Sequence, residues 1–259
     1  MPLLVSVRSA EEVSAALAGG ADIIDAKEPA RGSLGAVDRE VLLAIAARTP
    51  RSVPLSVALG DCATEAETRR AVSGARLPGR SAPVYLKLGL AGTLSVKRVL
   101  SLLRSAVDTA AEDDPAPAIV AVAYADHRVP RMPPPEEVLR ATSMARASGL
   151  LIDTFRKDGG GLLDHLSLER LSALSLRARS AGLLFALAGS LDSDAIARVA
   201  PLADVVGVRG AACQGGRDGT VSAERVAGLR HRAFARPLLA GARVSAPSPP
   251  IQAGNRRTR

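Results

Sequence analysis

The sequence predicts a single (β/α)8 barrel, a TIM barrel of the α/β class. Its length of 259 residues is close to that of the typical member of this fold. Short apolar runs alternate with longer segments of helical period, the pattern of a parallel sheet built from βα units. Since no break in composition divides these repeats, we expect closure into a barrel rather than a doubly wound open sheet, the second fold that the pattern allows.

Apolar runs of four to six residues mark the strands, and Ala-, Leu- and Arg-rich segments mark the helices. Ser9 is the expected cap of the first helix, and Asp192 of the seventh. The predicted strands are Leu3 to Val7, Asp22 to Ala26, Val53 to Ala58, Val84 to Leu88, Ile119 to Tyr124, Leu150 to Asp153, Leu183 to Ala188 and Asp204 to Val208. The predicted helices are 10–19, 38–48, 64–74, 95–110, 136–147, 166–181, 192–199 and 222–231.

The positive charge is concentrated near the end of the chain. The formal net charge is +8, but the residues after Leu229 hold seven arginines and no acidic residue, so the remainder has 27 basic and 26 acidic residues. We predict a catalytic barrel over 1–240 and a disordered Pro/Ser/Arg tail over 241–259. No aromatic residues alternate with the tail arginines, so we do not expect nucleic acid as a partner.

Composition argues against several other classes of protein. Cys62 and Cys213 are isolated and the three histidines are scattered, so neither a metal site nor a disulfide framework is predicted. No apolar run has the roughly 18 residues of a membrane span, and no signal peptide is recognisable. We therefore expect no membrane association and a cytoplasmic protein.

Lysine is scarce, which makes its positions informative. The chain has 34 basic residues, of which only Lys27, Lys87, Lys97 and Lys157 are lysines. An amine can lose its proton and attack a carbonyl, whereas a guanidinium stays protonated. Lys97 lies in a predicted helix and is expected on the surface; the other three lie at or just beyond strand ends, where barrel enzymes place their reactive groups.

Acidic residues accompany these lysines. Asp25 and Lys27 lie on one face of the second strand, Lys87 ends the fourth, and Asp153 ends the sixth, followed by Lys157. Side chains of alternate strands share a layer inside a barrel, so these groups are predicted to converge. Neighbouring cations lower the pKa of an amine, which favours a Schiff-base lysine, although a lysine could instead bind phosphate as a point charge.

Glycine-rich loops follow the seventh and eighth predicted strands, the usual phosphate-binding position in barrels. Arg217 could add a charge-assisted hydrogen bond there. A further loop, 28–35, either covers the substrate or is a plain connection. The candidate substrate- and phosphate-binding residues are Gly189, Ser190, Arg209, Gly210, Gly215 and Gly216.

Five segments in order resemble the (5-formylfuran-3-yl)methyl phosphate synthase family of methanofuran biosynthesis, also called 4-(hydroxymethyl)-2-furancarboxaldehyde-phosphate synthase. The resemblance extends from the first strand to about residue 230. The segments are 21–29 (ADIIDAKEP), 32–35 (GSLG), 85–89 (YLKLG), 153–159 (DTFRKDG) and 207–213 (GVRGAAC).

The resemblance implies a homo-oligomeric barrel enzyme that condenses two molecules of glyceraldehyde 3-phosphate into a phosphorylated furan aldehyde, with loss of phosphate and water. No cofactor or metal is implied. Lys27 would form the Schiff base and Lys87 would accept a proton, while Asp25, Asp153 and Lys157 would assist proton transfer or binding. The residues alone leave two alternatives: a class I aldolase acting on another sugar phosphate, and a non-catalytic barrel that binds a phosphometabolite.

Overall fold

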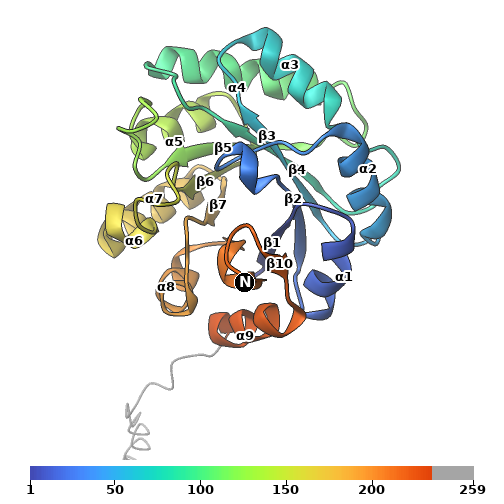
Figure 1. The fold of residues 1–259 in the computed structure, drawn as a ribbon. Coiled ribbons are helices and arrows are strands. Elements are labelled where there is room, and N and C mark those ends of the chain that lie inside the picture. The colour runs from blue at the N-terminus through green and yellow to red at the C-terminus, as the bar shows by residue number, and fades with distance from the viewer. Residues whose placement is uncertain (235–259) are drawn as a thin grey trace, which may run out of the picture.

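In the computed structural model, which describes residues 1–234, eight parallel strands close into a barrel (Figure 1). Each strand pairs with the next in chain order, and β8 pairs with β1. The predicted barrel is therefore confirmed and the open sheet is excluded. The strands are β1 (Leu3–Val7), β2 (Ile23–Ala26), β3 (Leu55–Asp61), β4 (Val84–Gly89), β5 (Ala118–Tyr124), β6 (Gly149–Asp153), β7 (Leu184–Leu187) and β8 (Val205–Val208).

The helices form the outer ring around these strands (Figure 1). Each of the first seven strands is followed by at least one helix, and α9 follows β8 after a short hairpin. The α-helices are α1 (Glu11–Ala18), α2 (Arg39–Arg48), α3 (Glu65–Gly74), α4 (Val96–Ala110), α5 (Pro135–Met144), α6 (Leu162–His165), α7 (Leu168–Ser180), α8 (Ser193–Val199) and α9 (Ala223–Phe234). The 3-10 helices are η1 (Pro29–Arg31), η2 (Ala200–Leu202) and η3 (Gly210–Ala212).

Of the two predicted caps, one is confirmed and one is wrong. Asp192 accepts hydrogen bonds from the backbone of residues 194 and 195 at the start of α8. Ser9 does not cap α1, because Ala10 occupies that position. The Ser9 hydroxyl instead bonds to the carboxylate of Glu11, the main cause of the lowered pKa of that group.

Two loop features differ from the sequence-based expectation. The predicted end of β3 was Ala58, but the strand continues to Asp61 through a register shift. Gly60, with a φ of 82° that favours glycine, allows this irregularity. The loop after β8 also contains an unpredicted antiparallel hairpin of β9 (Cys213–Gln214) and β10 (Thr220–Val221).

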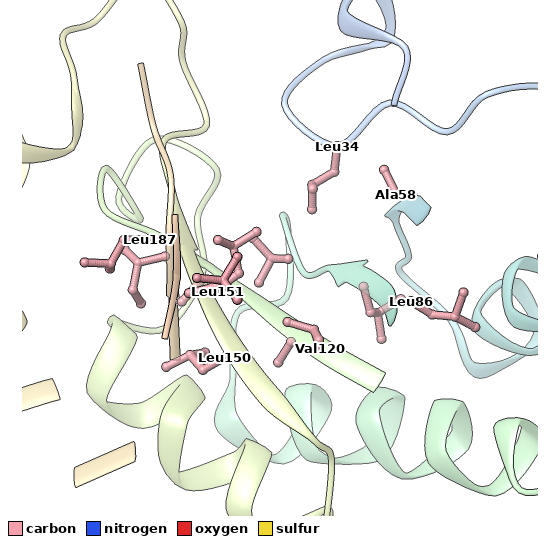
Figure 2. Close-up of a cluster of buried hydrophobic side chains, with 14 of the residues drawn as sticks. Leu34, Ala58, Leu86, Val120, Leu150, Leu151 and Leu187 are labelled. Carbon is pink, nitrogen blue, oxygen red and sulfur yellow. The ribbon is translucent and has the colours of Figure 1, made fainter. Parts of the chain in front are cut away.

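Aliphatic side chains fill the space between barrel and helices, as the scarcity of aromatic residues predicts. Alternation along each strand separates the two faces. On β6, Leu150 is buried on the side of the helices, whereas Leu151 faces the interior with Val120 (Figure 2). Leu34 reaches toward the barrel from the loop after β2 and is 1% exposed (Figure 2).

A buried ion pair ties together the seam where the barrel closes. Both carboxylate oxygens of Glu12 on α1 accept bonds from Arg209, which directly follows β8, and each side chain is 3% exposed. The remaining donors of Arg209 bond to the carbonyls of Ser6, Arg217 and Gly219. All five N–H donors of this guanidinium therefore have partners.

The predicted tail, 241–259, lies outside the described residues. Within residues 1–234, no helix combines the length and the apolar character that a membrane crossing requires.

We predict that Glu12→Ala lowers the free energy of unfolding by about 3–5 kcal/mol, because it leaves the buried Arg209 charge without its partner. Denaturant unfolding would measure the change. Arg8→Ala is the matched control, because Arg8 lies 4.0 Å from Glu12 and its side chain is 40% exposed. It should cost less than about 1 kcal/mol. Equal losses in the two variants would contradict the assignment.

Candidate active site

The even-numbered strands bring the predicted residues into one cavity. Asp25 lies on β2 and Lys87 on β4, Asp153 ends β6, and Lys27 directly follows β2. All four line the cavity, together with Lys157 from the loop after β6. Period-two alternation and the layering of alternate strands account for this convergence.

Asp25 and Lys87 form a buried pair. Lys87 Nζ lies 2.7 Å from Asp25 Oδ1 and 2.8 Å from Oδ2, but only the contact with Oδ2 has hydrogen-bond geometry. The hydroxyl of Ser6 donates to the same Oδ2 at 2.7 Å. Burial raises the pKa of Asp25, but Lys87 and Lys27 outweigh it and hold the pKa below its ordinary value. Asp25 is therefore an ionised carboxylate.

Asp153 and Lys157 form the second pair. Lys157 Nζ donates to Asp153 Oδ1 at 2.7 Å and to the carbonyl of Thr154 at 2.6 Å. Burial opposes ionisation of Asp153, but Lys157 and Lys27 lower its pKa to about 2. Asp126, which follows β5, holds the loop after β6 in place by accepting hydrogen bonds from the backbone of residues 155 and 156.

Lys27 is the unpaired member of the group. It is 6% exposed, and Nζ makes no hydrogen bond or ion pair with any residue in 1–234. Burial lowers the pKa of Lys27 to about 7, and Lys87 and Lys157 add repulsion, while Asp153 and Asp25 oppose the change. A substantial fraction of Lys27 is therefore a neutral amine near pH 7, the form that attacks a carbonyl.

The cavity has a volume of about 350 Å³ and reaches down into the barrel. Small side chains leave this space, since Ser6, Ser56, Ala186 and Gly207 face inward where many barrels carry bulky branched residues. The upper end lies between the loops after β7 and β8. This shape suits a small molecule with an anionic group at the loop end and its carbon skeleton near Lys27.

The backbone at the loop end of the cavity comes from the loops after β7 and β8. Gly189, Ser190 and Gly210 line the cavity, as does Ala211. In the part of the chain that the structure describes, none of their four N–H groups has an acceptor. Gly189 has a φ of 109°, and an added Cβ would lie 3.0 Å from Thr154 Cγ2, so this position requires glycine.

Arg217 completes this end. It lines the cavity and donates through Nη2 to the carbonyls of Pro29 and Gly32, at 3.3 and 2.7 Å. Burial lowers its pKa, with Asp153 opposing, yet a guanidinium stays protonated at ordinary pH. Arg217 therefore presents a cation to the cavity while tying the loop after β8 to the loop after β2.

Three candidate phosphate ligands have other roles in the structure. Arg209 faces the cavity, but Glu12 and backbone carbonyls occupy all five of its donors. Gly215 and Gly216 do not line the cavity; with φ of 81° and 75°, they form the turn between β9 and β10. These two glycines allow a hairpin turn, and the sequence pattern of such a turn is the same as that of an anion-binding loop.

The loop 28–35 is a connection rather than a wall of the cavity, since none of its residues lines it. The Ser33 hydroxyl donates to the Tyr124 hydroxyl at 3.0 Å, and Tyr124 donates to Asp61 at 3.0 Å. Burial raises the pKa of Tyr124 well above its usual value, so this network stays protonated at Tyr124.

Ser6 and Ser56 were not predicted as site residues from the sequence, although both line the cavity. A serine at an inward position of an otherwise apolar strand was the available signal. Lys97 is exposed on α4, as predicted. Among residues 1–234, no three His, Cys, Asp or Glu side chains are grouped as metal ligands.

The model of the 4-HFC-P synthase family matches residues 3–230, which is nearly the whole barrel. The chain belongs to this family. The match includes Lys27, Lys87 and Lys157 with their acidic partners. The resemblance found in the five sequence segments is thereby confirmed, and the family is one of enzymes.

Archaeal relatives of the chain carry a common name. The (5-formylfuran-3-yl)methyl phosphate synthase of Methanothermobacter thermautotrophicus is 37% identical over 241 residues, covering 92% of this chain and 97% of the relative. The enzyme of the same name from Methanocaldococcus jannaschii is 38% identical over 238 residues, covering 89% and 98%. The similarity therefore spans nearly the full length of these relatives.

Solved structures agree on the fold alone. A phosphoribosyl anthranilate isomerase from Thermus thermophilus has a TM-score of 0.56 at 16% identity, covering 90% of this chain and 98% of its own. KGPDC from Streptococcus mutans has a TM-score of 0.54 at 13% identity, with coverages of 90% and 97%.

We predict that the reactivity of Lys27 toward an amine-specific reagent rises with pH through a midpoint near 7. Asp153→Asn should move this midpoint lower, because the ionised Asp153 raises the pKa of Lys27. Site-resolved mass spectrometry after brief labelling over a pH range of roughly 5 to 10, spanning the shifted and the ordinary lysine pKa, would measure both. A Lys27→Met variant identifies the Lys27 signal, and a midpoint that rises in Asp153→Asn would contradict this electrostatic account.

Proposed function

We propose that the chain is a (5-formylfuran-3-yl)methyl phosphate synthase of methanofuran biosynthesis that works through an imine at Lys27. Two triose phosphates would give the furan phosphate, one inorganic phosphate and two molecules of water. The observation that carries the proposal is the state of Lys27, a buried amine without a partner among residues 1–234 and with a pKa of about 7. Two ionised carboxylates and two further lysines lie in the same cavity.

The first steps follow from imine chemistry. Neutral Lys27 attacks the aldehyde carbon of glyceraldehyde 3-phosphate, and loss of water gives an iminium. The iminium withdraws electrons from the bond between C2 and its hydrogen, and the Asp25–Lys87 pair accepts that proton. The electron pair released in this way forms an enamine, which expels phosphate from C3. Lys157, held by Asp153, lies in the cavity where it can protonate or bind the departing phosphate.

The remaining steps join the two trioses. Elimination leaves an enol whose C3 attacks the middle carbon of a second triose phosphate, which would first have isomerised from glyceraldehyde 3-phosphate to its ketone form by transfer of a proton from C2 to C1 through an enediol. This attack places the phosphomethyl branch on the ring. A terminal hydroxyl then closes the ring on C2, and two dehydrations produce the aromatic furan. Hydrolysis of the imine returns Lys27 and releases the formyl group. Each dehydration needs a proton donor and an acceptor, which supports a role for both pairs.

The loop end of the cavity is the proposed phosphate site. The N–H groups of Gly189, Ser190, Gly210 and Ala211 and the guanidinium of Arg217 support this assignment. Arg209 is proposed to position this loop instead of binding phosphate itself. The homo-oligomeric state implied by the family remains a prediction, and size-exclusion chromatography with light scattering would test it.

We predict that borohydride traps a covalent adduct on wild-type protein incubated with glyceraldehyde 3-phosphate, detected by intact mass. Lys27→Arg should lose the adduct, the furan absorbance and phosphate release together, because a guanidinium forms no imine. An adduct without furan would favour an aldolase acting on another sugar phosphate. The absence of both adduct and turnover in the wild type would exclude the imine mechanism and favour a binding protein.

We also predict that Arg217→Met raises KM for glyceraldehyde 3-phosphate by about tenfold or more, since a charge-assisted hydrogen bond contributes about 1.5–3 kcal/mol. Imine trapping with unphosphorylated glyceraldehyde should change little. Arg156→Met serves as the control, because Arg156 is paired with Asp158 and does not line the cavity. Equal weakening with both aldehydes would show that Arg217 does not recognise phosphate.

A further inference from the structure

On the inner face of the barrel, Asp25 has a serine beside it on each of the two neighbouring strands. Ser6 on β1 is its register partner on one side, and Ser56 on β3 is its partner on the other. Both serines line the cavity and both are almost completely buried, at 2% and 0% exposure. The three residues form a polar row across adjacent strands.

The two hydroxyls differ in their partners. Ser6 donates to Asp25 Oδ2 at 2.7 Å, whereas Ser56 Oγ has no hydrogen-bond partner within residues 1–234. A buried hydroxyl without a partner destabilises a fold, and alanine would occupy this wall without that penalty. Because Ser56 lines the cavity beside the charged groups, its missing partner is best supplied by a molecule bound there.

We propose that Ser56 binds the C2 hydroxyl of the triose held as an imine on Lys27. The inference rests on the proposed function and adds a specificity-determining contact to it. Lys27 lies two residues beyond Asp25 on the same strand face, and Ser56 is in register with Asp25. An imine carbon on Lys27 and the carbon next to it would therefore lie in the same cavity as the row that contains Asp25 and Ser56.

This contact would orient the bond that breaks. C2 of glyceraldehyde 3-phosphate carries one hydroxyl and one hydrogen, and only the hydrogen is to be removed. A hydroxyl held by Ser56 fixes the rotation about the C1–C2 bond and directs the hydrogen toward the Asp25–Lys87 pair. Ser56 can donate or accept, so it can keep this bond when C2 becomes part of an enol. Ser6 acts differently, as a positioning residue for the Asp25 carboxylate.

The test compares glyceraldehyde 3-phosphate with 3-oxopropyl phosphate, which lacks the C2 hydroxyl. Both can form an imine and both can eliminate phosphate, so phosphate release gives kcat/KM for each. We expect Ser56→Ala to lower kcat/KM for glyceraldehyde 3-phosphate by roughly threefold to tenfold, the effect of one neutral hydrogen bond. The value for 3-oxopropyl phosphate should stay within about twofold of wild type, because that substrate never makes the contact.

Ser6→Ala is the matched comparison within the row. It removes a hydrogen bond to Asp25, which serves both substrates, so both rates should fall by a similar factor. Ser175→Ala controls for the loss of a buried serine elsewhere, since Ser175 bonds to the Leu202 carbonyl outside the barrel interior. It should leave both rates unchanged.

Folding and imine formation are measured separately. Ser56→Ala should keep or raise the midpoint of thermal unfolding, because it removes a hydroxyl that has no partner within residues 1–234. If Ser56→Ala slows both substrates equally, or slows neither, the C2-hydroxyl contact is overturned while the proposed function stands. If wild-type protein forms no borohydride-trapped imine and releases no phosphate, both proposals are overturned.

Discussion

The structure depends on an imbalance of charge inside the barrel. Two buried carboxylates face three amines, and each carboxylate is paired with one of them, Asp25 with Lys87 and Asp153 with Lys157. Lys27 is left without a counterion of its own among the described residues, and it is 6% exposed. Loss of its proton makes the group of five electrically neutral, which explains why burial lowers the pKa of Lys27 to about 7.

Such an arrangement favours function over stability. Burying an ion pair gains little free energy once the cost of desolvation is subtracted. Burying Lys27 as a neutral amine also costs free energy, because the hydration of its ammonium form in the unfolded chain is lost. The unpartnered hydroxyl of Ser56 adds a further penalty. The aliphatic shell between the barrel strands and the helices must offset these costs, and the polar residues Ser6, Asp25, Ser56, Lys87 and Asp153 lie on the inner face, where they line the cavity.

Local sequence pattern was enough to predict the barrel and the convergence of the five charged residues in one cavity. Strand alternation assigns Asp25 and Lys27 to one face, and the layering of alternate strands brings Lys87 and Asp153 to the same height. The roles of Arg209, Gly215 and Gly216 depended instead on contacts distant in sequence or on turn geometry. Glu12 lies about two hundred residues from Arg209, so no local signal could reveal that its guanidinium is already occupied. Predicting a role for Ser56 would have required knowing that its hydroxyl has no hydrogen-bond partner within the described residues, which the sequence does not show.

In the proposed mechanism, the charge created by imine formation would couple the two ends of the cavity. In the free protein, Arg217 is a cation at the loop end and has no carboxylate partner among residues 1–234. It lies beside backbone N–H groups that have no acceptor within those residues. In the proposed mechanism, a phosphate bound there would bring negative charge into the cavity that holds Lys27, and the protonated imine would be a positive charge at that position. Phosphate and the ionised Asp153 would therefore stabilise the protonated imine more than the neutral amine. An unphosphorylated aldehyde would lack this stabilisation, so recognition of phosphate at the loops would also favour the proposed covalent intermediate at Lys27.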